Sequence, residues 1–156
     1  MSEIFINKAR TVALTGHRVI GRDFDREQVK ELFISLINDG YDTFLDGMAI
    51  GFDIECCKIL LELRKKFDIR VIGCIPCPTQ AEKFNYKQKE EYTNLRAKID
   101  GEVVVSLNYT DTCMKKRNEF MVDNASLLLA YLRRDFGGTA NTVNYARKNL
   151  VKTVII

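Results

Sequence analysis

The sequence of 156 residues has a single histidine, no repeated or low-complexity segment, and no stretch rich in proline, serine or glycine that would indicate a linker. One histidine excludes a metal site made of several imidazole ligands. Without repeats or linkers there is no internal boundary, so we predict one domain over residues 1–156. A hydrophobic content of 46% is enough for a packed core.

Long apolar runs are also missing, since none approaches the roughly 20 residues that a membrane-spanning helix needs. The chain starts Met1-Ser2-Glu3, without the basic and apolar leader of an exported protein. We therefore expect no membrane partner and a cytoplasmic location. A large excess of one charge is missing too, because the sequence has 24 Lys and Arg and 21 Asp and Glu. The resulting formal charge of +3 does not by itself indicate a nucleic-acid-binding protein.

The five cysteines are an odd number, which is typical of a reducing compartment rather than of a disulfide framework. Cys74 and Cys77 have the spacing of a redox pair or of half a zinc site. No second pair completes four zinc ligands, and Pro78 and Thr79 intervene before a helix can start, unlike in a thioredoxin-like motif. We therefore predict no metal and no cofactor. Cys56 and Cys57 are expected to pack as small apolar residues and Cys74 to be a buried strand residue, whereas Cys77 is expected near the crevice at the carboxyl ends of the strands.

Short β-prone runs alternate with helical patterns along the chain. The predicted strands are 11–15, 43–45, 69–74, 102–105, 126–132 and 152–156. Helices are predicted after Asp25, after Gly51, from a capping box of Thr79 with Glu82, over 113–124 and after Gly137. Strands separated by helices, several of them apolar throughout, predict an α/β fold: a three-layer, Rossmann-like, open and mainly parallel sheet with helices on both faces.

Glycine-bearing loops follow three of these strands. Thr15-Gly16-His17-Arg18 follows the first, Gly47-Met48-Ala49-Ile50-Gly51-Phe52-Asp53 the second, and Gly137-Gly138-Thr139 opens the last helix. Backbone N–H groups at two helix amino ends, with Arg18 on the same edge of the sheet, favour an anionic ligand, most often a phosphate. Any one of these loops alone is more typical of an ordinary turn, and neither a Walker A loop nor a Gly-x-Gly-x-x-Gly fingerprint is present.

These motifs, together with Arg117-Asn118, Ser126 and the Thr142 and Ala146 that follow Gly138-Thr139, resemble those of the SLOG superfamily over nearly the whole chain. That superfamily includes the Rossmann domain of DNA-processing protein A, the Lonely guy phosphoribohydrolases and the YpsA-like proteins. The segment from Pro76 to Gln80 makes the resemblance strongest to the YpsA-like branch. The resemblance implies a Rossmann-like domain whose glycine loops bind nucleotides or nucleotide-derived molecules, and a tendency to form oligomers.

Two departures from the relatives bear on function. Lonely guy enzymes carry a catalytic Glu shortly after Gly-Thr, whereas Ala140, Asn141 and Thr142 stand there in this chain. Without that carboxylate we lean against an enzyme, and expect a module that senses or sequesters a nucleotide-derived ligand, such as an ADP-ribose-like molecule. Two alternatives stay open: a nucleotide hydrolase or phosphoribohydrolase using His17 or Asp53, and a single-stranded nucleic-acid-binding domain, which the composition favours less.

Several residues have two interpretations each. His17 is either a ligand contact or a loop residue that only hydrogen-bonds, and Asp53 contacts a ribose hydroxyl or caps the helix that begins there. Tyr109 and Phe136 either stack on a base or pack. The predicted ligand-binding set is Thr15, Gly16, His17, Arg18, Gly47, Met48, Ala49, Gly51, Asp53, Pro76, Gln80, Arg117, Asn118, Gly137, Gly138, Thr139, Asn141 and Thr142.

Overall fold

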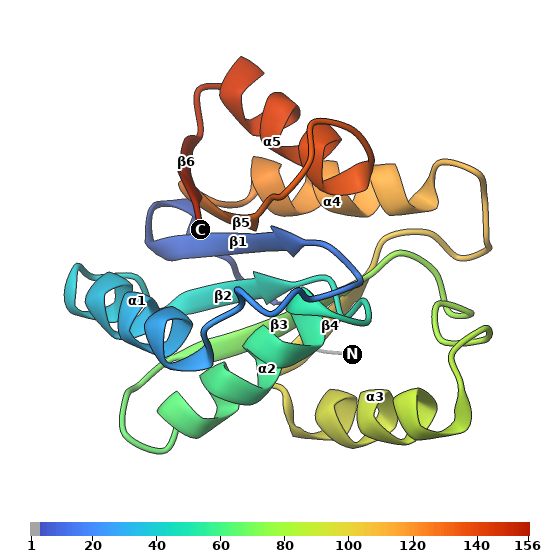
Figure 1. Cartoon of the computed structure of the whole chain (residues 1–156), viewed down its shortest axis with the longest axis horizontal. Coiled ribbons are helices and arrows are strands. Elements are labelled where there is room, and N and C mark those ends of the chain that lie inside the picture. Colours follow the sequence, from blue (N-terminus) through green and yellow to red (C-terminus); the bar gives the residue numbers. More distant parts are fainter. Residues whose placement is uncertain (1–3) are drawn as a thin grey trace.

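Figure 1 shows a computed structural model, which describes residues 4–156 and places a twisted sheet between two layers of helices. The strands are β1 (Thr11–Gly16), β2 (Thr43–Asp46), β3 (Arg70–Ile75), β4 (Gly101–Val104), β5 (Leu127–Tyr131) and β6 (Lys152–Ile155). The helices are the short 3-10 helix η1 (Lys8–Arg10) and the α-helices α1 (Arg26–Asn38), α2 (Phe52–Leu63), α3 (Tyr86–Lys98), α4 (Cys113–Asp123) and α5 (Gly138–Lys148). Over the described residues the sheet has the order β4-β3-β2-β1-β5-β6, and each neighbouring pair is parallel.

The predicted three-layer, Rossmann-like α/β fold is confirmed. The central strands β2 and β5 are buried along their whole length because helices cover both faces of the sheet. In Figure 1, α1, α2 and α3 cover one face, while α4 and α5 cover the other. Phe33, Phe44 and Leu60 lie in the core of the first layer, and Met121 and Val143 lie in that of the second. Within residues 4–156 no helix is long and apolar enough to cross a bilayer.

Local signals set the ends of the helices. The Asp25 carboxylate accepts the N–H groups of Glu27 and Gln28 at the start of α1, and Gly40 follows the helix with a φ of +108°, which only glycine adopts without strain. The start of this helix agrees with the helix predicted after Asp25.

The predicted start of α3 is wrong. Thr79 does not open a helix with Glu82, since Glu82 N–H bonds to the Thr79 carbonyl in a turn and the Thr79 hydroxyl lies 3.5 Å from Cys77 Sγ. The helix begins at Tyr86 instead, with a reciprocal capping box between Asn85 and Gln88. The segment 77–84 is therefore a series of turns beyond the end of β3.

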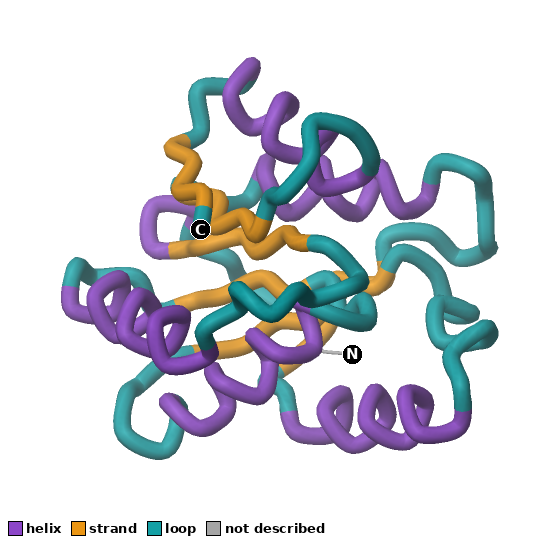
Figure 2. Tube along the Cα trace, viewed as in Figure 1, coloured by secondary structure: helices purple, strands orange, loops and turns teal. Residues whose placement is uncertain are grey.

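The chain changes direction beside β1, which lies between β2 and β5 in the sheet. It passes from β1 to β2 through α1 on one face, and returns from β4 to β5 through α4 on the other face. The loops after β1 and β5 therefore leave the sheet toward opposite layers, which opens a crevice at this switch point. Figure 2 shows the long loops after β3 and β4 at the same end of the sheet, toward which the arrows of Figure 1 point.

Candidate functional site

A cavity of about 710 Å³ lies at this switch point. Its walls come from the loop after β1, the start of α2, the face of α4, and the loop that leads from β5 into α5. We call it the crevice. Of the predicted ligand-binding set, those that line it are Thr15, Gly16, His17, Arg18, Ala49, Asp53, Arg117, Asn118, Gly138 and Thr139.

The remaining predicted residues are placed differently. Gln80 lines a second cavity of about 480 Å³, which shares Arg18 and Ala49 with the crevice. Asn141 and Thr142 line a hollow of about 240 Å³ on the other side of Gly138. Five predicted residues line none of these three cavities: Gly47, Met48, Gly51, Pro76 and Gly137.

The amino end of α5 is open to the crevice. Gly137 precedes the helix with a φ of +95°, no side chain caps the helix, and its first turn carries no acidic residue. Within residues 4–156 the N–H groups of Gly138 and Thr139 have no hydrogen-bond acceptor, and a Cβ on Gly138 would meet nothing within 4 Å. These N–H groups are therefore available to an anion, at the positive end of the helix dipole.

The turn that leads into α2 is closed by comparison, although no side chain caps α2 itself either. The Asp46 carboxylate accepts the Met48 N–H at 2.8 Å, the Asp53 carboxylate accepts the Ala49 N–H at 3.3 Å, and the His17 carbonyl accepts the Phe52 N–H at 3.1 Å. Asp53 thus neither caps the helix nor stands free, because it closes the turn that precedes its own helix. The Met48 side chain is wholly buried in the core.

Two glycines let this turn lie against its neighbours. Gly51 has a φ of +90°, and a Cβ there would overlap the backbone carbonyl groups of His17 and Arg18. A Cβ on Gly47 would lie 2.7 Å from Arg117 Nη1 and 2.8 Å from Asp53 Oδ2. Both glycines therefore serve the close approach of protein groups to the turn.

Arg117 holds the turn from the opposite side of the sheet edge. It is only 5% exposed, and its Nη1 donates to the Gly47 carbonyl at 2.5 Å and to the Cys74 carbonyl at 3.2 Å. Its Nε donates to Asn118 Oδ1 at 2.8 Å. The Gly47 carbonyl also accepts Gln80 Nε2 at 2.8 Å, and Tyr92 donates to Gln80 Oε1. Most donors of Arg117 and Gln80 are thus engaged within the protein.

Asp46 and Asp53 form a buried acidic pair beside Arg117. Asp46 is 0% and Asp53 6% exposed, and one oxygen of each, Asp46 Oδ2 and Asp53 Oδ1, has no hydrogen-bond partner. Burial raises the pKa of Asp46 well above its usual value, and the neighbouring Asp53 raises it further. Burial also raises the pKa of Asp53, to about 6, against the opposing effect of the Arg117 charge. With a pKa of about 6, Asp53 is largely ionised at neutral pH beside the Arg117 guanidinium, and the raised pKa of Asp46 favours the protonated form of that carboxyl group.

His17 joins the two loops that flank the switch point. Its Nε2 accepts the Arg133 N–H at 2.8 Å, so this nitrogen carries no proton. Burial, followed by the charges of Arg134 and Arg133, lowers the pKa of His17. The neutral imidazole therefore holds the loop after β1 against the loop after β5, while its ring also lines the crevice.

The arginines around the crevice are not equally available. Arg133 is paired with Asp23 at 2.5 Å, and its guanidinium lies 4.1 Å over the ring of Tyr131. Arg18 and Arg134 have no carboxylate partner within residues 4–156. Arg134 was absent from the predicted set, although the set includes Gly137, Gly138 and Thr139 of the same loop after β5.

Cys77 lines the second cavity, and no cysteine lines the crevice. All five cysteines are free and buried, and burial raises the pKa of Cys56 and Cys57, and that of Cys74 to about 12. Within the described part of the chain, no three His, Cys, Asp or Glu side chains are grouped to hold a metal ion. Of the two aromatic candidates, Tyr109 lines the second cavity, while Phe136 lies beneath Arg134 and lines none of the three cavities.

Comparison with known proteins gives both sequence and structural relatives. Residues 22–153 match the family model YpsA, described as the YspA SLOG family. The uncharacterized SPbeta prophage-derived protein YoqJ of Bacillus subtilis (strain 168) is 28% identical over 120 residues, 67% of this chain and 69% of YoqJ.

Among solved structures, two DNA processing A proteins share the fold. The protein from Helicobacter pylori, described as binding single-stranded DNA, has a TM-score of 0.68 at 16% identity, over 93% of this chain and 64% of that one. The protein from Streptococcus pneumoniae has a TM-score of 0.68 at 12% identity, over 93% of this chain and 49% of that one. This chain thus spans less than two thirds of either protein.

Proposed function

The chain belongs to the YspA SLOG family, and we propose that it binds a nucleotide or nucleotide-derived molecule in the crevice, with a phosphate group at the amino end of α5. The observation that carries this proposal is the uncapped start of α5, whose free Gly138 and Thr139 N–H groups face a cavity large enough for a nucleotide. The Thr139 hydroxyl adds a further donor at the same point.

Charge around the crevice supports the same ligand. Arg18 and Arg134 line it without carboxylate partners, so they can approach a phosphate without giving up an ion pair. The acidic groups nearby are already engaged: Asp23 is paired with Arg133, and Asp53 is buried beside Arg117. The residues after Gly138-Thr139 include no carboxylate, so the proposed role is binding, by sensing or by sequestration, and not hydrolysis.

Single-stranded DNA is the second candidate ligand. It is favoured by the fold shared with the Helicobacter pylori DNA processing protein A, which is described as binding single-stranded DNA. A single strand would follow the same cationic edge, and its affinity would fall steeply with salt because each phosphate contact releases a counterion. A mononucleotide in a closed subsite would lose much less affinity over the same salt range.

Gly138 offers a sharp test. Its Cβ position is empty and its φ is not in the left-handed region, so Gly138→Asp and Gly138→Asn both fit and differ mainly in charge. We expect nucleoside monophosphates to raise the thermal midpoint of the wild type, Gly138→Asp to lose roughly tenfold or more in affinity, and Gly138→Asn to lose less. Titration calorimetry measures the affinities. No shift with any nucleotide, or equal losses in both variants, contradicts a phosphate at this point.

A further inference from the structure

The second cavity continues the crevice. Its volume is about 480 Å³, and Arg18, Ala49 and Met114 line both spaces. A ligand that fills the crevice therefore has a direct path past Arg18 into a second enclosed space. The turns of segment 77–84 form the far wall of that space.

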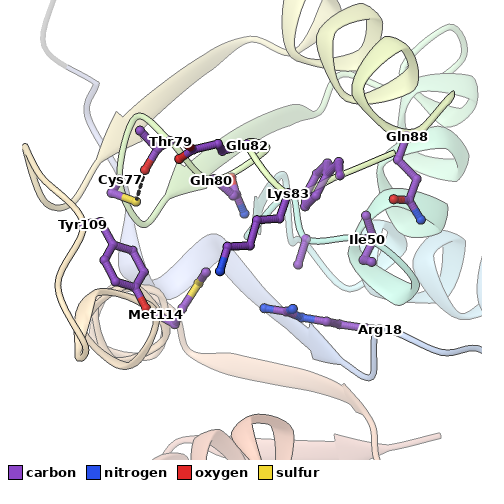
Figure 3. A pocket seen from close by; sticks show the side chains of 12 residues that line it. Arg18, Ile50, Cys77, Thr79, Gln80, Glu82, Lys83, Gln88, Tyr109 and Met114 are labelled. Carbon is purple, nitrogen blue, oxygen red and sulfur yellow. Dashed lines mark hydrogen bonds between the residues drawn. The ribbon is translucent and has the colours of Figure 1, made fainter. Parts of the chain in front are cut away.

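Two unpaired cations face each other in this cavity. Figure 3 shows the Lys83 ammonium group and the Arg18 guanidinium pointing into the same space from opposite sides, with Met114 beside them. Neither cation has a carboxylate within 4.0 Å among residues 4–156. Glu82 also lines the cavity, but its side chain lies on the Thr79 side, away from Arg18. The space between the two cations is therefore suited to an anion.

The walls on either side of these cations are suited to a flat, partly polar group, and Figure 3 shows Tyr109 and Thr79 on one side and Ile50 and Gln88 on the other. Ile50, Phe84 and Tyr109 supply apolar and aromatic surface, and the Gln88 amide and the Thr79 hydroxyl supply polar atoms. A nucleoside has this mixture of a stacking face and hydrogen-bonding edges. The molecule thus presents the open start of α5, then the crevice that it borders, and then the second cavity, which holds the Arg18–Lys83 pair and adjoins the crevice at Arg18, Ala49 and Met114.

We propose that this order matches the order of groups in a 5′-phosphorylated dinucleotide. The 5′-phosphate binds at α5, the first nucleoside fills the crevice, the bridging phosphate lies between Arg18 and Lys83, and the second nucleoside fills the second cavity. This inference rests on the proposed function, because it assigns the ligand class of the same site. It adds Lys83 as a specificity-determining residue.

The test compares AMP with the dinucleotide pApA by titration calorimetry. We expect pApA to bind about tenfold more tightly than AMP, since it gains one charge-assisted contact and a stacking surface. Lys83→Gln removes most of that gain and leaves the affinity for AMP unchanged. Lys87→Gln is the matched control, because Lys87 is also exposed and lies four residues further on but lines neither cavity. An unchanged thermal midpoint in both variants verifies folding.

The outcomes separate this inference from the proposed function. If AMP binds but pApA binds no better, or if both lysine variants lose affinity equally, the two-subsite inference is overturned while the phosphate site stands. If neither AMP nor pApA binds, both proposals are overturned. A hexanucleotide that binds like pApA supports a site for two nucleotides, whereas affinity that rises with every added nucleotide overturns it in favour of a single strand.

Discussion

The amino ends of α2 and α5 are alike in sequence and opposite in structure. Both follow a buried strand of a parallel sheet and begin at a glycine with positive φ. The N–H groups of the turn before α2 are bonded within the protein, because Asp46, Asp53 and the His17 carbonyl accept them. Arg117 donates to the Gly47 carbonyl of the same turn. Before α5, the His17 imidazole accepts the Arg133 N–H, but the Gly138 and Thr139 N–H groups have no acceptor within residues 4–156. One glycine turn is therefore held within the protein, and the other is the turn at which we propose that the ligand binds.

Replacement of Arg117 is expected to give the largest difference in stability between a variant at the turn before α2 and a variant at the turn before α5. Replacement by Met removes the donor that holds Gly47 and leaves Asp53 as an uncompensated buried charge, so we expect a loss of about 3–5 kcal/mol in the free energy of unfolding. Urea denaturation measures it. Arg134→Met at the other turn is the control and should leave the unfolding midpoint nearly unchanged. Equal losses of unfolding free energy in the two variants would show that both turns are held equally firmly by the rest of the protein.

Gly51 and Gly137 provide the next comparison. Both have positive φ, but only at Gly51 would a Cβ overlap backbone atoms. We expect Gly51→Ala to cost about 3 kcal/mol or more, from strain and overlap together, and Gly137→Ala to cost about 1 kcal/mol from strain alone. Chemical denaturation of the two variants gives the difference. A cost at Gly137 as large as at Gly51 would contradict the open turn before α5.

The buried acids make the closed turn sensitive to pH. The folded pKa of Asp53, about 6, lies above the ordinary value of 3.8 for an aspartate. The folded state therefore holds its proton more tightly. This contribution to stability is fully present below about pH 4 and is lost as pH rises through about 6.

Asp53→Asn should remove that dependence. Relative to the variant, the wild type should lose about 2 kcal/mol of unfolding free energy between pH 4 and pH 7, an order-of-magnitude value for a nearly buried group. Denaturation of both proteins over this range gives the difference, in which the titration of unrelated groups largely cancels. A constant difference over the range would mean that Asp53 is already ionised at pH 4.

The smallest effect is expected at Gly138. Its Cβ would meet open space at the first position of α5, so Gly138→Ala should change the free energy of unfolding by no more than about 0.5–1 kcal/mol, in the stabilising direction because alanine favours helix. Thermal denaturation without ligand measures it. A clear destabilisation by Gly138→Ala would mean that the added methyl group meets protein atoms, and would contradict the open space at this turn.

The sequence predicts the architecture well, for a simple physical reason. Alternating apolar strands and amphipathic helices determine a parallel sheet, and the caps at Asp25 and Gly40 depend only on neighbours in the chain. The predicted start of α3 is wrong because the sequence offers two capping pairs, Thr79 with Glu82 and Asn85 with Gln88. The side chains of Thr79 and Gln80 found partners at Cys77, Gly47 and Tyr92, so the second capping pair, Asn85 with Gln88, began the helix.

The difference between the two glycine turns could not be predicted from either turn alone. The closed turn depends on Arg117, which lies 70 positions from Gly47 in the chain, and the sequence does not reveal which carbonyl that guanidinium meets. Lys83 was missed for a related reason. A helix predicted to start at Thr79 would have placed it on a helical surface, whereas the observed turns direct it into the second cavity.

The hydrogen bond between His17 and Arg133 has a consequence for the crevice as a whole. Its acceptor is an imidazole nitrogen, and protonation would turn that nitrogen into a donor facing another donor, the Arg133 N–H. Because the pKa of His17 is lowered, this repulsion appears only in acid, below the usual range of histidine. Acidification is thus expected to separate the loop after β1 from the loop after β5 and to widen the opening of the crevice. The protonation of one nitrogen is enough to start this change.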